Sequence, residues 1–364
     1  MVPAAMWLAL IGLILIGPVF GYAADATPRA APLRPGGPPP VVALAPLPGR
    51  KIGGVDCVRI SDLASRLGLQ VSVRDRGKRA SFTGPVGRTE LERDAREATI
   101  DGLRVFLGDP VVEAGGHLYV SRIDAERCLT PLLRPGLGVK VPTAPRIVVL
   151  DPGHGGKDNG TSAHEKTYAL DVARRAKKLL EDSGVRVVLT RDSDVFLDLP
   201  QRAAIANANR ADLFVSIHFN ALPRDTKTSG VEVFTFAPQF QRSTNSWSPR
   251  ESDDTEREAA PVNRHDHWSA VLAHAVHRRF VVDLKTFDRG KKLAHWGVLR
   301  ALSCPGVLIE CGFLTSESES RKIGTVAYRQ KLAEALAAGV RDYGITIEGP
   351  TRRPTYAPPD TRAP

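Results

Sequence analysis

The sequence predicts an α/β fold: a mixed, largely parallel sheet flanked by helices, preceded by a small α+β domain. Hydrophobic strands and amphipathic helices alternate over residues 146–348, a pattern typical of a sheet with helices packed on its faces. Shorter strand and turn signals fill residues 50–141. Of the 364 residues, 42% are hydrophobic and 25% are charged, an ordinary globular composition. A wholly disordered, collagen-like or polytopic membrane protein is therefore excluded.

Residues 146–348 supply the elements of the predicted sheet. Five apolar runs are predicted as strands, namely RIVVLD (146–151), VRVVLT (185–190), DLFVSIHFN (212–220), VEVFTF (231–236) and GVLIE (306–310). The remaining periodic segments are predicted as helices, at 165–184, 199–209, 267–284 and 326–343. In such sheets, functional groups collect at the carboxyl ends of the strands.

The smaller domain is predicted from shorter signals. Its expected elements are a helix, two strands and a second helix, at 58–69, 71–75, 79–84 and 126–136. Hairpin turns are expected at Asp101-Gly102 and Gly115-Gly116, because such pairs adopt the positive φ angles of tight turns. Residues 139–146 are expected to link this domain to the larger one.

Residues 1–24 predict a cleaved secretory signal peptide. The run Met6–Phe20 is almost wholly apolar, and no charged side chain precedes Asp25. Its about 15 apolar residues are fewer than the roughly 20 that span a bilayer, and small residues follow it. An uncleaved anchor is the alternative, and both place the chain outside the cytoplasm, in the periplasm or in the cell wall and extracellular space. Residues 25–49 are predicted as a Pro/Ala-rich linker, and residues 349–364 as a disordered tail.

Four side chains at the ends of predicted elements can carry chemistry. His154 follows the first strand on a glycine-rich turn, His218 ends the third strand, and Glu310 ends the last apolar run. Glu165 opens the helix that follows the first strand. If the sheet is parallel here, these groups converge at one edge. Two neutral imidazoles and one carboxylate then form a three-ligand Zn²⁺ site with an open position for water, and the other carboxylate can act as a base.

Each of these residues also has an ordinary structural explanation. A histidine at a strand end is often simply hydrogen-bonded, and the helix dipole favours a first-turn glutamate such as Glu165. The turn GGKDNG lacks the ending of a phosphate loop. Glu310 is more informative, because a carboxylate after three apolar residues is costly to bury without a cation or metal. His164, as a competing ligand, and His295, as a substrate-orienting group, are further candidates.

Five segments of the second half carry a more specific signal: DPGHGGKDNG, HEKT, TRDSD with LPQRAAIAN, SIHFNA, and GVLRALSCPGVLIECGFL. In this order they closely resemble the zinc-dependent N-acetylmuramoyl-L-alanine amidases of type 3, over about residues 146–345. The resemblance implies hydrolysis of the peptidoglycan amide between N-acetylmuramic acid and the L-alanine of the stem peptide, for cell-wall remodelling or daughter-cell separation. It also implies that His154, Glu165 and His218 bind one Zn²⁺, and that Glu310 is the catalytic residue.

Other parts of the chain match known patterns less closely. Residues 50–141 loosely resemble the small N-terminal domain of copper amine oxidases, through RISDLASRLGLQVSV and GGHLYVSRIDAERCL. No copper-ligand set accompanies them, so this likeness implies a binding or spacer module. The run GFLTSESES departs from the family, which usually has an Asn after FLS. The polar stretch 237–268 leaves three alternatives open: a substrate-binding flap, a regulatory plug or a disordered loop.

The charge suggests the kind of partner. A formal charge of +10 favours a polyanion, and peptidoglycan, with its carboxylates, is the expected substrate. The export signal and the lack of interleaved aromatic and basic residues argue against nucleic acid. No stable membrane insertion is expected after signal removal. The need for a protein activator and the oligomeric state stay open.

Two other functions are compatible with the sequence, and the state of two cysteines is open. The first rival is a wall-binding protein that keeps the fold without activity, and the second is another exported zinc hydrolase such as a peptidase. HEKTY lacks the second histidine of the HExxH signature, which disfavours a peptidase of that kind. Cys57 and Cys128 either form a disulfide, as an exported protein allows, or remain thiols.

Overall fold

The computed structural model describes residues 44–84, 87–162, 164–244 and 257–349. The predicted signal peptide lies outside these residues, as do most of the predicted linker and tail. Among the described helices, none is long and apolar enough to cross a membrane.

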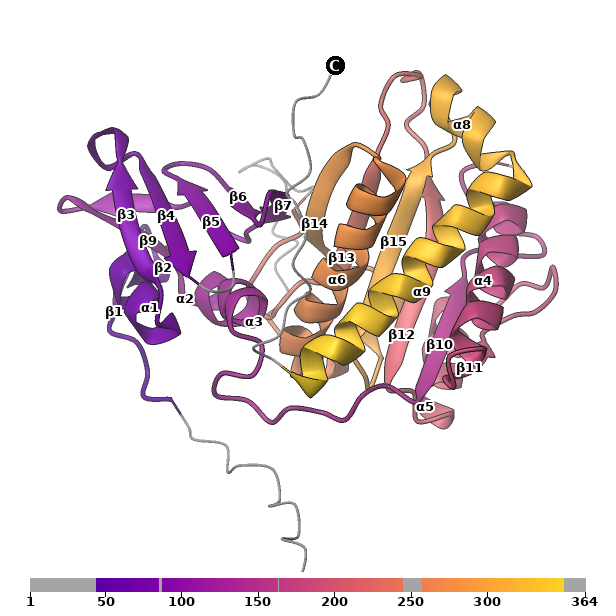
Figure 1. The fold of residues 1–364 in the computed structure, drawn as a ribbon, viewed down its shortest axis with the longest axis horizontal. Coiled ribbons are helices and arrows are strands. Elements are labelled where there is room, and N and C mark those ends of the chain that lie inside the picture. The colour runs from indigo at the N-terminus through magenta and orange to yellow at the C-terminus, as the bar shows by residue number, and fades with distance from the viewer. Residues whose placement is uncertain (1–43, 85–86, 163, 245–256, 350–364) are drawn as a thin grey trace, which may run out of the picture. The chain divides into compact units, whose positions relative to one another are not determined.

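A mixed sheet organises the second half of the chain (Figure 1). Its strands lie in the order β11, β10, β12, β15, β13, β14. The first four run parallel, β13 is antiparallel to β15, and β14 is parallel to β13. The prediction of a mixed, largely parallel sheet is confirmed. The strands are Ile147–Pro152 (β10), Arg186–Leu189 (β11), Leu213–Asn220 (β12), Val231–Phe236 (β13), Asp288–Ala294 (β14) and Gly306–Phe313 (β15).

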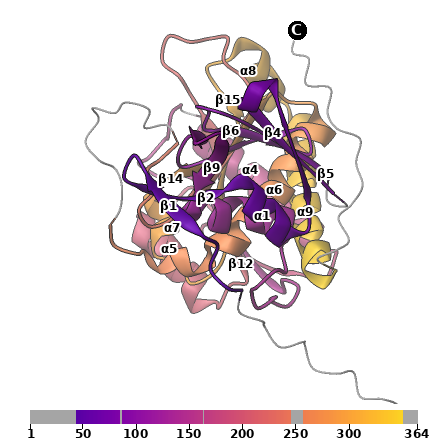
Figure 2. The ribbon, with the colours of Figure 1, turned by 90° about the vertical axis from the view of Figure 1, so that its left-hand side faces the viewer.

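The same sheet continues into the first half of the chain, which faces the viewer in Figure 2. β14 pairs in parallel with β7, where Lys291 lies opposite Val105, and β6, β5, β4 and β3 follow. β1, β2, β9 and β8 form a separate sheet. Both expected hairpin turns are present, at Asp101-Gly102 and Gly115-Gly116. The strands are Gly49–Ile52 (β1), Val55–Arg59 (β2), Gln70–Arg74 (β3), Arg79–Gly84 (β4), Gly87–Glu92 (β5), Glu97–Ile100 (β6), Leu103–Phe106 (β7), Val112–Ala114 (β8) and His117–Ser121 (β9).

Helices cover both faces of the larger sheet. α4, α6 and α9 form one hydrophobic core with strand residues such as Val215 and Ile309. α5 and α7 form another with Phe214 and Leu308 on the opposite face. These helices are Glu165–Glu181 (α4), Leu199–Ala208 (α5), Asp266–Leu284 (α6), Gly297–Arg300 (α7) and Val326–Glu348 (α9), and α8 is Glu317–Ile323. The other helical segments are Ile60–Leu67 (α1), Asp75–Gly77 (η1), Arg122–Asp124 (α2), Ala125–Leu129 (η2), Thr130–Leu133 (α3) and Pro261–His265 (η3).

The alternation of strand side chains decides which face carries the candidate residues. Residues two apart on a strand point to the same face. His218 therefore lies on the face of Phe214, and Glu310 on the face of Leu308, which is the face that α5 and α7 cover.

β14 is the main element of this sheet that the sequence pattern did not predict. Its sequence, DRGKKLA, has two adjacent lysines, a composition that argues against a buried strand. Lys291 and Lys292 are nonetheless 1% and 8% exposed.

Of the two alternatives for Cys57 and Cys128, the structure shows free thiols and not a disulfide. Both side chains are buried.

Candidate metal centre

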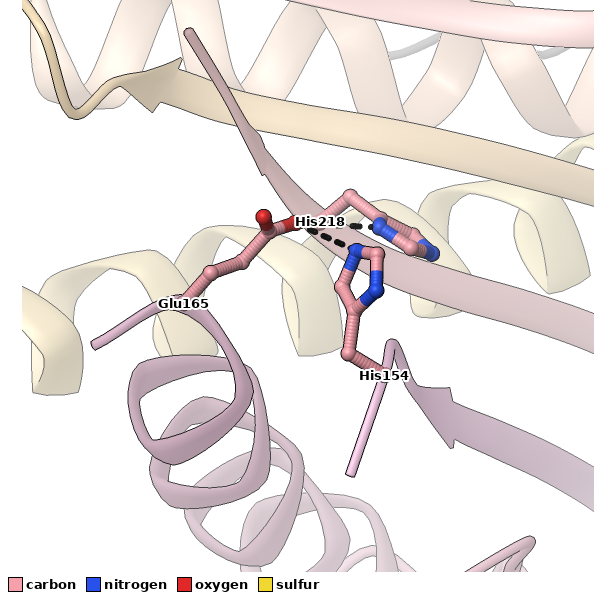
Figure 3. A group of neighbouring side chains, drawn as sticks. All are labelled: His154, Glu165 and His218. Carbon is pink, nitrogen blue, oxygen red and sulfur yellow. Dashed lines mark hydrogen bonds and ion pairs between the residues drawn. The ribbon is translucent and has the colours of Figure 1, made fainter. Parts of the chain in front are cut away.

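Three predicted ligands lie together at the carboxyl edge of the sheet (Figure 3). His154 Nε2 and His218 Nδ1 each lie 3.1 Å from Glu165 Oε1. The two imidazole rings are 4.8 Å apart between centroids and meet nearly edge to face. One donor atom from each residue can be chosen so that all three lie within 4.8 Å of one another.

The fold explains why residues so distant in sequence meet. β10 and β12 are adjacent and parallel, so their carboxyl ends lie side by side. His154 leaves β10 with φ of 59°, a left-handed conformation that is uncommon outside glycine and recurs at functional sites. A Cβ on Gly153 would lie 2.3 Å from His218 Cε1, and one on Gly160 would lie 2.3 Å from Glu165 Oε2. Glycine at both positions lets the backbone pass close to the ligands.

Two of the three predicted ligands are held by further hydrogen bonds. Asp158 Oδ2 lies 2.8 Å from Nδ1 of His154, which leaves Nε2 directed at the other ligands. Glu165 Oε2 accepts hydrogen bonds from the backbone N–H of Thr161 at 2.6 Å and from its hydroxyl at 2.8 Å. Such bonds fix the orientation of metal ligands and their basicity.

The electrostatics favour positive charge beside Glu165. Burial alone would raise the pKa of this carboxyl, which is 1% exposed, but hydrogen bonds and charge from His154 and His218 hold its pKa well below the usual range. Burial lowers the pKa of His154, yet Glu165 and Asp158 outweigh that effect and raise it. A bound divalent cation supplies the same positive charge. Two imidazole nitrogens and one carboxylate oxygen are a donor set that fits zinc.

Two buried arginines hold the turn that carries His154. Arg191 Nη2 donates to the carbonyl of Gly153 at 2.7 Å. Arg202 donates from Nη2 to the carbonyl of His154 at 2.8 Å, and from Nη1 to Asp151 Oδ1 at 2.8 Å. The sequence analysis gave these arginines no role. A charged residue among the alanines of LPQRAAIAN was the available signal, because a helix rarely buries an arginine without a partner.

Glu310 lies beside the three ligands. It is the cross-strand partner of His218 in the pairing of β15 with β12. Its Oε2 is buried and has no hydrogen-bond partner within the described residues. Burial, and then the negative charges of Glu165 and Glu232, raise the pKa of Glu310 well above its usual value. A carboxyl with these surroundings takes up a proton more readily than a surface carboxylate does.

Glu232 is a buried acid that the sequence analysis missed. It is the partner of Glu310 on the other side, in the pairing of β13 with β15. Its Oε1 accepts a hydrogen bond from Arg289 Nε at 2.7 Å and one from Lys292 Nζ at 2.8 Å. The cost of burying a carboxylate, which singled out Glu310, applied equally to the glutamate in VEVFTF.

The two further histidine candidates lie apart from the cluster. His164 is exposed, and its ring stacks on Tyr168 at 5.5 Å. His295 Nδ1 lies 3.4 Å from Ser243 Oγ, and its ring is 5.3 Å from that of Phe236. Part of the polar stretch 237–268 lies outside the described residues, so its three alternatives stay open.

Comparison with known proteins gives consistent matches. The profile of the family described as N-acetylmuramoyl-L-alanine amidase matches residues 148–342. N-acetylmuramoyl-L-alanine amidase AmiA of Escherichia coli (strain K12) is 33% identical over 220 residues, which are 54% of this chain and 76% of AmiA. The uncharacterized protein YqiI of Bacillus subtilis (strain 168) is 34% identical, over 58% of this chain and 91% of YqiI. The crystal structure of an N-acetylmuramoyl-L-alanine amidase from Clostridium difficile 630 has 32% sequence identity and a TM-score of 0.45, covering 55% of this chain and 97% of that one.

Proposed function

This chain belongs to the N-acetylmuramoyl-L-alanine amidase family, and from that premise we propose how its residues carry out the reaction. The enzyme hydrolyses the amide between N-acetylmuramic acid and the L-alanine of the stem peptide in peptidoglycan. We assign one zinc ion to His154, Glu165 and His218, and the role of general base to Glu310.

One observation carries the assignment of roles. Three donors lie within 4.8 Å of one another, and Glu310 is paired in register with one of them. His218 and the base are thus neighbours on adjacent strands. We place the attacking water and the scissile carbonyl between the base and the metal.

The residues then divide the reaction between them. When bound, zinc supplies Lewis-acid chemistry, because it polarises a carbonyl and lowers the pKa of water from about 15.7 toward roughly 7. Glu310 takes the proton from the attacking water and passes it to the departing amine of L-alanine. Burial and the neighbouring carboxylates raise the pKa of Glu310, which strengthens it as a proton acceptor. Asp158 and Thr161 keep His154 and Glu165 aimed at the site.

The central experiment separates the base from the ligands. Glu310→Gln is expected to lower turnover of purified peptidoglycan by at least about 100-fold while the zinc content stays unchanged. His154→Ala is expected to lose both activity and metal. The matched controls are Glu317→Gln and His164→Ala, which change exposed residues outside the cluster. Wild-type lysis by Glu310→Gln would contradict its role.

Product analysis separates the amidase from a peptidase and from an inactive wall-binding protein. Digestion by the mature protein should yield new L-alanine amino termini and intact sugar strands, as identified by mass. A chelator should abolish the reaction and added Zn²⁺ should restore it. Cleavage within the stem peptide would instead favour the peptidase, and no cleavage would favour the binding protein.

The proposal also covers where the enzyme acts and what the first half of the chain does. The relatives named as amidases support action outside the cytoplasm, in the periplasm or cell wall. Residues 50–141 would serve as a binding or spacer module, as their likeness to the small domain of copper amine oxidases implies. Binding of the Glu310→Gln protein to insoluble peptidoglycan, compared with the same protein bearing substitutions on the exposed face of β3 and β4, tests the module.

A further inference from the structure

Four large apolar side chains are exposed around the starts of α5 and α7. Val195, Phe196, Leu199 and Trp296 are 46%, 42%, 49% and 40% exposed. Soluble proteins seldom leave neighbouring large apolar side chains in water, and where they do the patch often binds a ligand.

These side chains form one rim next to the turn of His154. A Cβ on Gly156 would lie 2.7 Å from Phe196 N, so residue 196 lies against the glycines that follow His154. A Cβ on Gly297 would lie 2.9 Å from Leu199 Cδ1, so Leu199 reaches the residue next to Trp296. The rim therefore extends from the ligand turn to the start of α7.

The rim lies on the same face of the sheet as the reacting groups. The Trp296 ring meets Phe234 edge-on, with centroids 5.8 Å apart. Phe234 is paired with Leu308, which lies two residues before Glu310 on the same face of β15. The indole therefore contacts Phe234, whose cross-strand partner Leu308 is two residues from the proposed base Glu310.

A cationic group also lies next to Glu310. Arg289 and Lys292 bind Glu232, the partner of Glu310, and this group carries a net positive charge. The Arg289 guanidinium lies 5.0 Å from the Phe313 ring, at the carboxyl end of β15. A cationic group and the exposed apolar rim therefore lie on the same face of the sheet as Glu310, and Lys292 Nζ is 5.9 Å from the Phe234 ring that Trp296 meets. The substrate has matching halves, since its stem peptide carries carboxylates and its pyranose ring has an apolar C–H face.

We propose that Phe196, Leu199 and Trp296 form the subsite for the sugar of the substrate. The C–H face of the muramic acid ring stacks on this rim, and the stem peptide extends toward Arg289. The proposal deepens the amidase function and rests on it. It concerns how the glycan is bound, and no step of the hydrolysis depends on it.

The test compares two substrates with the same scissile amide. One is a disaccharide tripeptide from peptidoglycan, and the other is an N-lactoyl-L-alanyl peptide, which lacks the sugar ring. Trp296→Ala should lower kcat/KM on the first about five- to tenfold, mainly by raising KM, and change it less than twofold on the second. Trp296→Phe should keep most of the activity. Ile345→Ala, which removes an equally exposed apolar side chain from α9, should behave as wild type on both.

Each contrary result has one meaning. Equal losses on both substrates would show that the rim binds the peptide or only supports the fold, and would overturn the proposal. So would unchanged kinetics. If the wild type cleaves the lactoyl peptide too slowly for kcat/KM to be measured, a binding experiment replaces the kinetic one. Calorimetry then measures the binding of a peptide-free glycan tetrasaccharide to the Glu310→Gln protein. Loss of that binding in Trp296→Ala supports the subsite, and its retention overturns it. Failure of the wild type on every muramoyl substrate would instead contradict the amidase function.

Discussion

Glu310 of β15 lies directly opposite His218 of β12, in the parallel pairing of the two strands. Backbone hydrogen bonds in the centre of the sheet thus set the spacing between the proposed general base and a proposed metal ligand. Sites built on strands are positioned more precisely than sites on loops.

Glu232→Gln should destabilise the protein. Glu232 is 3% exposed and bonds to both Arg289 and Lys292, so the amide would leave two cations without their counter-charge. Removing one partner of a buried ion pair costs about 3–5 kcal/mol, and since Arg289 is partly exposed we expect about 2–4 kcal/mol. Urea denaturation measures the change. A free energy of unfolding within about 0.5 kcal/mol of wild type, the range of ordinary surface substitutions, would mean that these ion pairs contribute little.

Gly160→Ala should abolish metal binding. Gly160 has φ of 74°, and its added Cβ would meet Glu165 Oε2 at 2.3 Å and His154 Cδ2 at 2.6 Å. Gly184→Ala is the matched control, because φ is 86° there and no atom lies within 4 Å of the new Cβ. Both variants should lose about 1–2 kcal/mol of stability to backbone strain.

Zinc content after dialysis separates the two glycine variants. Only Gly160→Ala should lose the ion and the activity with it. Equal zinc content in both would show that the ligands adjust to the extra methyl group without loss of the site.

Arg202→Lys should weaken zinc binding although it keeps the charge. The guanidinium bonds at once to His154 O and Asp151 Oδ1, and an ammonium group cannot span both acceptors in the same geometry. We expect about a 10- to 100-fold weaker zinc affinity, as for other groups that orient metal ligands. Competition with a chromogenic chelator measures it. Lys178→Arg, at an exposed position of α4, supplies a control that should leave the affinity unchanged.

Asp266→Asn should remove a pH dependence of stability. Burial raises the pKa of Asp266 to about 7, although Asn263 donates a hydrogen bond to it. The folded chain therefore keeps a proton that the unfolded chain releases near pH 4, so stability falls as the pH rises from about 4 to about 7. The variant lacks this titration.

The quantity to measure is the difference in the free energy of unfolding between wild type and Asp266→Asn at each pH. Between pH 5 and pH 8, wild type should lose about 3 kcal/mol relative to Asp266→Asn. Denaturation curves at the two pH values give it. Parallel pH profiles for both proteins would show that Asp266 is ionised in the native state throughout this range.

The sequence was most informative where burial dictates composition. β10, β12 and β15 are buried on both faces, so their apolar runs identified them and located His218 and Glu310 at their ends. The hairpin turns were equally plain, because Asp-Gly and Gly-Gly pairs favour the positive φ angles of tight turns.

Strand β14 and the two buried arginines were not predicted, because their burial depends on partners that sequence periodicity cannot reveal. β14 buries two lysines, and Lys292 forms an ion pair with Glu232 on the neighbouring strand. Arg191 and Arg202 are buried because they bond to backbone carbonyls of a turn about 40 to 50 residues away. Each such pairing is a tertiary contact, so the sequence can indicate that a charge is buried but cannot show which group pairs with it.

The pairing of β14 with β7 has a consequence for dissecting the protein. Arg104 N donates to Asp288 Oδ2 at 2.8 Å along the same seam. A chain that begins near residue 146 would lack β7, the strand that pairs with β14. The edge of β14 would then expose main-chain N–H and C=O groups, which can pair with another copy of the protein. A shortened enzyme is thus expected to aggregate unless the newly exposed edge of β14 is covered.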